Sequence, residues 1–369
     1  MNPVHAALLV IVAVSVSACS EVPENEGFAG LAAMVDSDSS HYFLQPGPGN
    51  TLSFPGDLGP HPQHRIEWWY LTANLQTTDG QPLGLQWTQF RQAIKPRPAD
   101  SPAPPPDAWP LEAAWMAHAA VSFDGRHRFA ERLARGDVGH AGAVAEPFRV
   151  WLDDWRLSAA VETGPGDTWH LDVQADGWGY DLQLANTGER VYHGDNGFSA
   201  KSFDGQGSMY FSLTDLAITG TVTLNGQVHQ VQGKGWFDRE WSSQLLKTGQ
   251  QGWDWFALHL DDGHKLMAFR LREDERDFLS ASWISPGGEV KAMGPGEITL
   301  SGTDWRESEN GRVPGRFRVQ IPDRNVDIQV SAPDGQYWND GLYPYWESPV
   351  SVKGSHTGVG YMELTGYGR

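Results

Sequence analysis

The chain of 369 residues is poor in cysteine and in positive charge. Cys19 is its single cysteine, so an intrachain disulfide cannot form and the paired Cys spacings of structural zinc sites are excluded. The 27 Lys and Arg residues are outnumbered by 46 Asp and Glu residues, which leaves a net charge of −19. Such an acidic chain is unsuited to phosphate backbones and to anionic lipid surfaces. We therefore predict no nucleic-acid partner.

Sequence motifs of several enzyme classes are also missing. The chain contains no H-E-x-x-H, no phosphate-binding P-loop, no G-x-S-x-G elbow and no dinucleotide-binding fingerprint. His61 and His64 are three residues apart, but Pro62 between them favours a loop over a metal-binding helix. We predict neither a metal nor a cofactor.

An apolar run long enough to span a membrane is missing from the N-terminus. Residues 6–18 (AALLVIVAVSVSA) have the length of a signal peptide and end in small residues before Cys19, a pattern that a bacterial lipoprotein signal peptidase cuts. We expect residues 1–19 to be a lipoprotein signal peptide, Cys19 to carry the lipid and residues 20–51 to be a tether. Ordinary secretion and an uncleaved anchor are the alternatives. Ser20 after the cysteine favours the bacterial cell envelope at the periplasmic face of the outer membrane.

Aromatic and β-forming residues are abundant. The chain has 17 Trp, 15 Phe and 10 Tyr residues, and 40% of its residues are apolar, which is enough for a packed core. From Leu52 onward, short runs rich in Val, Leu, Trp, Tyr and Thr alternate with turn dipeptides such as Asp79-Gly80. Residues 95–110 are dense in proline and are expected to form an extended surface loop. The pattern predicts an all-β fold.

An internal repeat divides the chain. The stretch EWWYL at residues 67–71 leads through an Asp-Gly turn to an apolar return strand, and DWFAL at residues 254–258 does the same. The stretch GKGWFD at residues 233–238 is echoed by GVGYME at residues 358–363. Both echoes occur in the same order, so we predict a duplication in which the first element opens each unit and the second closes it.

Each unit is predicted to be an antiparallel meander whose last strand pairs with its first, because such closure removes open sheet edges. We expect two tandem lipocalin-like antiparallel β-barrel or sandwich domains, at residues 52–242 and 243–369. A barrel of about eight strands leaves room for a packed core or for one small apolar ligand.

The stretch KGWFDREWSSQ at residues 234–244 places three consecutive charges inside an aromatic frame. Side chains of a strand alternate between two faces. One face then carries Trp236, Asp238 and Glu240, and the other carries Phe237, Arg239 and Trp241. Arg239 could pair with acids of a neighbouring strand, whereas an acid inside an aromatic cavity has its pKa raised by desolvation and can donate a proton. We predict Asp238 and Glu240 as catalytic candidates.

Further residues are candidates to line a ligand site. Glu67, Asp254 and Glu363 occupy positions in the repeat related to that of Asp238, and four acids are too many for one catalytic pair, so at least two are expected to be structural. The remaining candidates lie in apolar or glycine-rich stretches: Trp69, Arg91, His118, His193, Lys201, Tyr210, Trp236, Trp241 and Trp255. Buried histidines are more often hydrogen-bonded core residues than catalytic ones. The glycine-rich residues 193–212 are expected to form either a lid or a long turn.

Longer motifs carry a resemblance to a known family. The stretches HRIEWWYLTANL (64–75), GWFDREWSSQ (235–244), GWDWFALHLDDG (252–263) and GYMELTGYG (360–368) resemble the AttH/CrtC family, which is lipocalin-like and includes carotenoid 1,2-hydratases. The resemblance runs from about Leu52 to the C-terminus and implies two tandem lipocalin-like domains.

The resemblance also implies a chemistry. The hydratases add water across a terminal isoprenoid double bond, which requires a neutral carboxyl acid in a dry pocket and aromatic faces that stabilise a cation. Asp238 and Glu240 beside Trp236 have suitable side chains. Other members of the family are envelope lipoproteins or predicted hydrolases, so the activity transfers less securely than the fold.

Three functions remain open from the sequence. The leading expectation is a lipid-anchored envelope protein that binds a hydrophobic molecule, such as a lipid or an isoprenoid. The first alternative is a carotenoid 1,2-hydratase-like lyase or a secreted hydrolase that uses a buried carboxylic acid. The second is an accessory partner of an envelope transporter. An acid that faces an apolar cavity would favour chemistry, and an acid bonded to arginine would favour binding or scaffolding.

Overall fold

The computed structural model describes residues 42–97, 112–136, 138–160, 168–244, 246–308 and 310–368. The predicted signal peptide, the predicted lipidation site Cys19, most of the predicted tether and most of the proline-dense loop lie outside these residues. The described residues include no helical segment whose length and hydropathy would suit a bilayer span.

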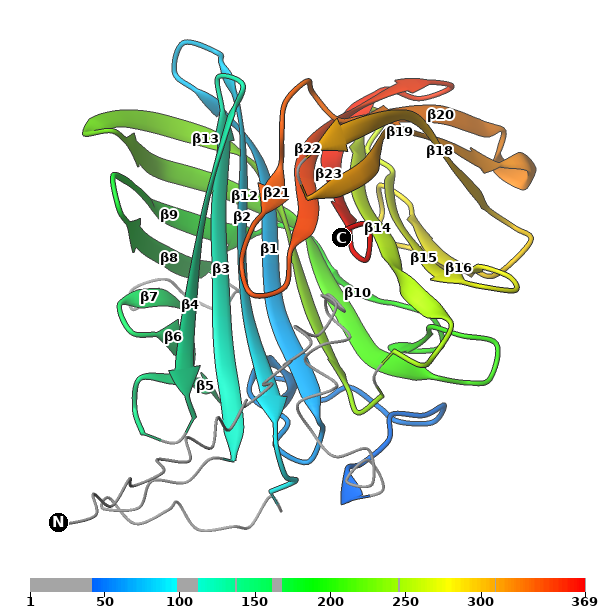
Figure 1. Ribbon diagram of the computed structural model, residues 1–369, viewed down its shortest axis with the longest axis horizontal. Coiled ribbons are helices and arrows are strands. Elements are labelled where there is room, and N and C mark those ends of the chain that lie inside the picture. Colours follow the sequence, from blue (N-terminus) through cyan, green and yellow to red (C-terminus); the bar gives the residue numbers. More distant parts are fainter. Residues whose placement is uncertain are drawn as a thin grey trace, which may run out of the picture.

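The regular secondary structure of the described residues consists almost entirely of antiparallel strands, as predicted, and these form two sheets (Figure 1). The strands of the first sheet are β1 (Ile66–Thr77), β2 (Pro82–Ala93), β3 (Ala113–Phe123), β4 (Arg126–Arg135), β5 (Ala141–Ala145), β6 (Phe148–Leu152), β7 (Trp155–Ala159), β8 (Thr168–Ala175), β9 (Trp178–Asn186), β10 (Arg190–Tyr192), β11 (Phe198–Ala200), β12 (Gly207–Leu224) and β13 (Gln227–Ser242). Their order is β4-β3-β2-β1-β13-β12-β9-β8-β7-β6-β5, and β10 and β11 pair with β12.

The strands of the second sheet are β14 (Gln250–Leu260), β15 (Lys265–Glu273), β16 (Phe278–Ile284), β17 (Val290–Met293), β18 (Thr299–Ser308), β19 (Gly311–Ile321), β20 (Val326–Ser331), β21 (Trp338–Asn339), β22 (Tyr345–Gly354) and β23 (Gly358–Leu364). Their order is β17-β16-β15-β14-β23-β22-β20-β19-β18, and β21 pairs with β22. A short 3-10 helix, η2 (Gly56–Leu58), precedes β1, and another, η3 (Pro322–Arg324), lies between β19 and β20.

The two sheets repeat one strand order, which agrees with the predicted duplication. In the first sheet the opening strand β1 pairs with the last strand β13, and in the second sheet β14 pairs with the last strand β23. The first sheet curls until β6 approaches β2, β3 and β4, so that it forms a nearly closed barrel. The expectation of two lipocalin-like β domains with first-to-last strand pairing is confirmed.

The interior of each unit is filled by its own side chains. The core of the first unit includes the fully buried Trp69, Trp87 and Trp169, and the core of the second includes Phe317 and Trp346. Inward residues of these strands alternate with outward ones, as a strand period of two requires. Of the two interiors that the barrel size allows, both units therefore have the packed core.

The outer faces of the two units pack against each other. Strand β1 lies against β23 and β2 lies against β22, and in Figure 1 the two sheets stand side by side at these strands. At Gly84 of β2 the contact is so close that a Cβ atom would lie 2.6 Å from the Tyr361 hydroxyl. Asn74 Nδ2 donates a hydrogen bond of 3.0 Å to the Gly360 carbonyl across the same seam. A third cluster of buried aromatic residues fills this seam.

Candidate functional site

A cavity of about 160 Å³ lies in the seam between the two units, outside both barrels. Most of its wall is apolar: Ile66, Trp68, Tyr70, Phe90, Leu246, Trp253, Trp255, Phe269 and Leu271. Three carboxyl groups reach into it, from Asp238, Glu240 and Glu363. One side is polar and is formed by Lys201 and Gln206 of the connection between β11 and β12, by Gln244 after β13 and by Gln250 at the start of β14. The cavity therefore combines aromatic walls with acids, and its polar side is partly exposed.

The alternation of β13 produces this arrangement. Phe237 and Trp241 point into the first barrel, where they belong to its core, and Arg239 shares their face. Trp236 points the other way, into the seam, and Asp238 and Glu240 share its face. The predicted sorting of the charged run into two faces is confirmed, and it separates an arginine in one interior from two acids in the other.

Asp238 is 2% exposed and is surrounded by neutral hydrogen-bond donors. Tyr210 Oη donates to its Oδ2 at 2.7 Å, Trp236 Nε1 donates to its Oδ1 at 2.6 Å, and the Ser212 hydroxyl donates as well. Burial raises the pKa of Asp238 to about 7 against the opposing effect of these donors. At neutral pH the group is therefore divided between its acid and its base form.

His193 lies behind Asp238 and orients its neighbours. Its Nε2 is 2.7 Å from the Ser212 hydroxyl, its Nδ1 is 2.8 Å from the Ser282 hydroxyl, and its ring stacks on Tyr210 at 4.0 Å. Burial holds the pKa of His193 well below its usual value, so the ring is neutral. Trp255 Nε1 donates to Tyr210 Oη at 3.2 Å. These bonds fix the donors that surround the Asp238 carboxyl group.

Glu363 and Glu240 complete the acidic part of the cavity. Trp253 Nε1 donates to Glu363 at 2.7 Å, and burial raises the pKa of Glu363 to about 7. Glu240 accepts a hydrogen bond from Ser208 and forms an ion pair of 3.0 Å with Lys201. Within the described residues, neither Asp238 nor Glu363 pairs with a lysine or an arginine. Only one of the three cavity acids is thus compensated by a cation.

The other two predicted acids have a different environment. Glu67, inside the first barrel, binds Arg91 of β2 and Arg239 of β13. Although burial opposes ionisation, the two guanidinium groups hold the pKa of Glu67 well below its usual value. Asp254, inside the second barrel, accepts hydrogen bonds of 2.6 Å from Arg270 Nε and from Arg272. Both acids are ion-paired and lie away from the cavity.

The remaining predicted residues divide between the barrels and the seam. Trp69 and Trp241 flank the Arg239 guanidinium group, at 3.9 and 5.1 Å from their ring centroids. Lys201 and Trp255 line the cavity, and Tyr210 and Trp236 bond Asp238 directly behind its wall. His118 is fully buried in the seam and bonds Tyr345 and Glu131.

The sequence reasoning missed several residues of the site. Trp68, Tyr70, Phe90, Trp253 and Phe269 line the cavity. Trp68 is next to the predicted Glu67 and Trp69, and Trp253 is next to the predicted Asp254. The sequence therefore indicated the right strands but not which face of each strand lines the cavity. Glu347, a fully buried acid in the aromatic stretch YWES, was also missed.

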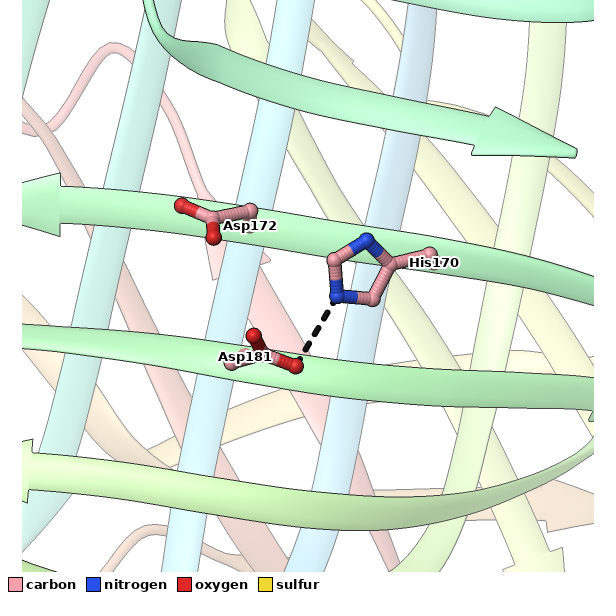
Figure 2. A group of neighbouring side chains, drawn as sticks. All are labelled: His170, Asp172 and Asp181. Atoms are coloured by element: carbon pink, nitrogen blue, oxygen red, sulfur yellow. Dashed lines mark hydrogen bonds and ion pairs between the residues drawn. The ribbon is translucent and has the colours of Figure 1, made fainter. Parts of the chain in front are cut away.

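One group of side chains in the described residues has donor atoms close enough to hold a metal ion. His170, Asp172 and Asp181 lie together on β8 and β9. His170 Nε2 lies 2.9 Å from Asp181 Oδ1, a hydrogen bond drawn as a dashed line in Figure 2. They are on the outside of the first barrel, and Arg156 of β7 is opposite Asp172 in the register, so a positive charge is already provided on this face.

His61, which was considered from the sequence as a metal ligand together with His64, has both of its ring nitrogens bonded to carboxylates, those of Glu67 and Asp57.

Comparisons with known proteins agree with this architecture. The family model AttH-like matches residues 45–367. An AttH protein from Nitrosomonas europaea is 30% identical, with 88% of this chain and 100% of that chain covered and a TM-score of 0.76. Kievitone hydratase from Nectria haematococca (13% identity, 88% and 98% covered, TM-score 0.63) and CghA with Sch210972 (14%, 90% and 98%, TM-score 0.52) share the fold. Among curated proteins no match was found.

Proposed function

The chain belongs to the AttH-like family, and on this premise we propose that it binds a small, mainly apolar molecule in the seam cavity and protonates it, in a hydratase-like addition of water to a carbon–carbon double bond. The observation that carries the proposal is the pair Asp238 and Glu363. Both face aromatic walls, both lack a cationic partner among the described residues, and both have a pKa of about 7. A kievitone hydratase of the same fold is consistent with this reaction class.

The size of the cavity limits what is enclosed. A volume of about 160 Å³ resembles the cavity of about 150 Å³ that holds benzene in an engineered protein. It would enclose a ring or a branched apolar end, and a longer molecule would extend past the polar side of the cavity. Each buried methylene contributes about 0.8 kcal/mol, so such an end binds usefully after association costs are subtracted.

The reaction follows from the two acids. One carboxyl group gives its proton to an alkene carbon, and the other carbon becomes a carbocation. The faces of Trp68 and Trp255 stabilise that charge at the apolar side of the cavity. A water molecule then bonds to the cation, and the second acid, which is ionised, accepts the proton that the water loses. The sum is alkene plus water giving alcohol.

The decisive experiment is turnover of a simple probe. We expect the full-length protein to convert geraniol to its hydrated alcohol in heavy-oxygen water, with the label in the product detected by mass spectrometry. Asp238→Asn and Glu363→Gln should each lower the rate by at least about 100-fold, as expected for loss of a general acid or base. Asp181→Asn, on the outer face of the barrel, is the matched control. Full activity in both cavity variants would refute the assignment.

Binding without turnover is the second candidate, because the aromatic wall alone suffices for it. In that case geraniol would be retained by the protein unchanged, and the Trp68→Ala variant would release it while the acid variants would not. The anchoring of Cys19 in the bacterial envelope and the association with an envelope transporter stay predictions. Mass spectrometry of the mature N-terminal peptide and mild crosslinking in native membranes would test them.

A further inference from the structure

A further buried acid, Glu347, lies directly behind the cavity wall. Glu347 of β22 is 1% exposed and is opposite Glu363 of β23 in the register. Tyr70 Oη donates a hydrogen bond to Glu347 Oε1 and is hydrogen-bonded to Glu363 as well. Asn339 Nδ2 donates to Glu347 Oε2 at 2.9 Å. Within the described residues Glu347 has no lysine or arginine partner, so its anion would be costly and its acid form is favoured.

Hydrogen bonds connect Glu347 onward to the surface. The Tyr345 hydroxyl bonds Glu347 and lies 3.0 Å from His118 Nδ1. His118 Nε2 lies 2.9 Å from Glu131 Oε2. The Glu131 side chain is 18% exposed, whereas His118 is fully buried. A continuous series of hydrogen-bonded groups therefore runs from the cavity to solvent on the β4 side of the seam.

The donors and acceptors of this series can all point one way. For inward transfer, a protonated Glu131 donates to His118 Nε2, and His118 carries its hydrogen on Nδ1 and donates to the Tyr345 oxygen. Tyr345 donates to Glu347, and a protonated Glu347 donates to the Tyr70 oxygen, which reverses the direction of that hydrogen bond. Tyr70 then donates to the Glu363 carboxylate. Each group can thus pass one proton and receive another, as a proton path requires.

We propose that Glu347 stores the proton that recharges the cavity acid Glu363 through Tyr70, and that Tyr345, His118 and Glu131 connect this store to solvent. The inference rests on the proposed function, in which Glu363 is then the acid and Asp238 the base. After each turnover Glu363 has lost a proton to the substrate carbon and Asp238 has gained one from water. Glu363 takes its new proton from Glu347, which is refilled from solvent, and Asp238 releases its proton when the product leaves.

The groups that face the two acids support a shared proton. Glu347 is met by these neighbours: Tyr70 of β1, Asn339 of β21, Tyr345 of β22 and Glu363 of β23. Glu363 is met by these: Trp253 of β14, Tyr70 of β1, and Asp238 and Glu240 of β13. Burial and the charge of Glu363 raise the pKa of Glu347 well above its usual value. The acid form of Glu347 is therefore favoured beside an ionised Glu363.

The coupling is tested without any substrate. In full-length protein with isotope-labelled glutamate, carboxyl NMR signals are assigned with Glu347→Gln and Glu363→Gln. We expect two titration steps in the wild type, and a fall of at least about one pH unit in the midpoint of Glu347 in Glu363→Gln, because a neighbouring negative charge is removed. Tyr70→Phe should raise the midpoint of Glu347 by about one unit, since it removes a donor to that carboxylate. Tyr367→Phe, whose hydroxyl lies 3.5 Å from an Arg270 guanidinium nitrogen inside the second unit, should change neither midpoint.

The route to solvent is tested by turnover of geraniol. Tyr345→Phe and His118→Gln should lower kcat on the order of tenfold with KM unchanged, and added imidazole should restore the His118→Gln rate. Unchanged kcat in both variants would refute the connection to solvent through Tyr345 and His118. An unchanged Glu347 midpoint in Glu363→Gln would refute the role of Glu347 as the proton store for Glu363. If the wild type turns over no probe, the proposed function fails, and the NMR titration still decides whether Glu347 and Glu363 share a proton.

Discussion

The pH dependence of stability gives the sharpest test of the cavity acids. Asp238 has an ordinary pKa of 3.8 in an unfolded chain and about 7 in the folded protein. Between these values the folded state keeps a proton that the unfolded state has released. The free energy of unfolding therefore falls as pH rises, by about 1.4 kcal/mol per pH unit. Protonated Asp238 therefore contributes on the order of 4 kcal/mol to the free energy of unfolding. This contribution is fully present below about pH 4 and is completely lost above about pH 7.

Buried histidines act in the opposite direction. The pKa of His127 and of His259 is lowered by burial from 6.5 to about 4. In this interval the unfolded state binds more protons, so each of these histidines makes the protein more stable as pH rises. The stability of the wild type alone is therefore a sum of opposing slopes. The contribution of Asp238 appears only in the difference between the wild type and Asp238→Asn.

The assay is urea unfolding of both proteins at fixed pH values from 4.5 to 8. The free energies of unfolding of Asp238→Asn and the wild type will differ in two ways. A difference that is the same at every pH arises because the amide does not replace every hydrogen-bond acceptor of the carboxyl group. A difference that changes with pH arises because the amide does not titrate. We expect the wild type to lose on the order of 3 to 4 kcal/mol relative to the variant across this range. Asp334→Asn, at an exposed carboxylate, should run parallel to the wild type. Parallel curves for Asp238→Asn would mean that Asp238 ionises normally, and the acid chemistry proposed for the cavity would then be refuted.

Three further predictions concern the surroundings of the site. Glu67→Gln should lower the free energy of unfolding by about 3 to 5 kcal/mol, because it leaves two buried guanidinium groups uncompensated. A smaller loss in urea unfolding would contradict this role of Glu67. Gly84→Ala should cost about 1 to 3 kcal/mol, because the added methyl group overlaps the second unit at the seam, and an unchanged thermal midpoint would contradict the close packing. Trp236→Phe removes a donor to Asp238 and should raise its pKa by about one unit, measured by the same difference in pH-dependent stability.

The local consequences of the sequence were predictable, and the docking of the two units was not. A strand period of two is a local property, so the two faces of residues 236–241 could be read directly. Which face is the barrel interior depends on the whole sheet. For this reason Trp69 was chosen as a ligand-lining residue, although it belongs to the barrel core, and its neighbour Trp68 was missed, although it lines the cavity. An error of one residue reverses the face.

The pairing of Glu67 was within reach of sequence reasoning, whereas Glu347 was not. Glu67 and Arg91 are direct partners in the hairpin of β1 and β2, whose turn dipeptide Asp79-Gly80 is visible in the sequence. Glu347 acquires its role from Tyr70, which is 277 residues away along the chain and in the other unit. Its local signal is only an acid in an aromatic strand, and Asp254 carries the same signal in a structural position.

The duplicated units suggest why two of the cavity acids remain without a cation. In the register Trp68 is opposite Glu240 and Trp255 is opposite Glu363, so Glu363 corresponds by register to Glu240 and not, as the sequence echo predicted, to Asp238 two residues earlier. The two units therefore supply equivalent acids to the cavity from opposite sides. Lys201, from the connection after β11, compensates Glu240, and nothing in the described second unit does the same for Glu363. A buried acid that is paired with a cation is held as an anion, whereas one that meets only neutral donors can keep and release a proton near neutral pH. The asymmetry created by Lys201 therefore distinguishes a structural acid from a proton donor within one cavity.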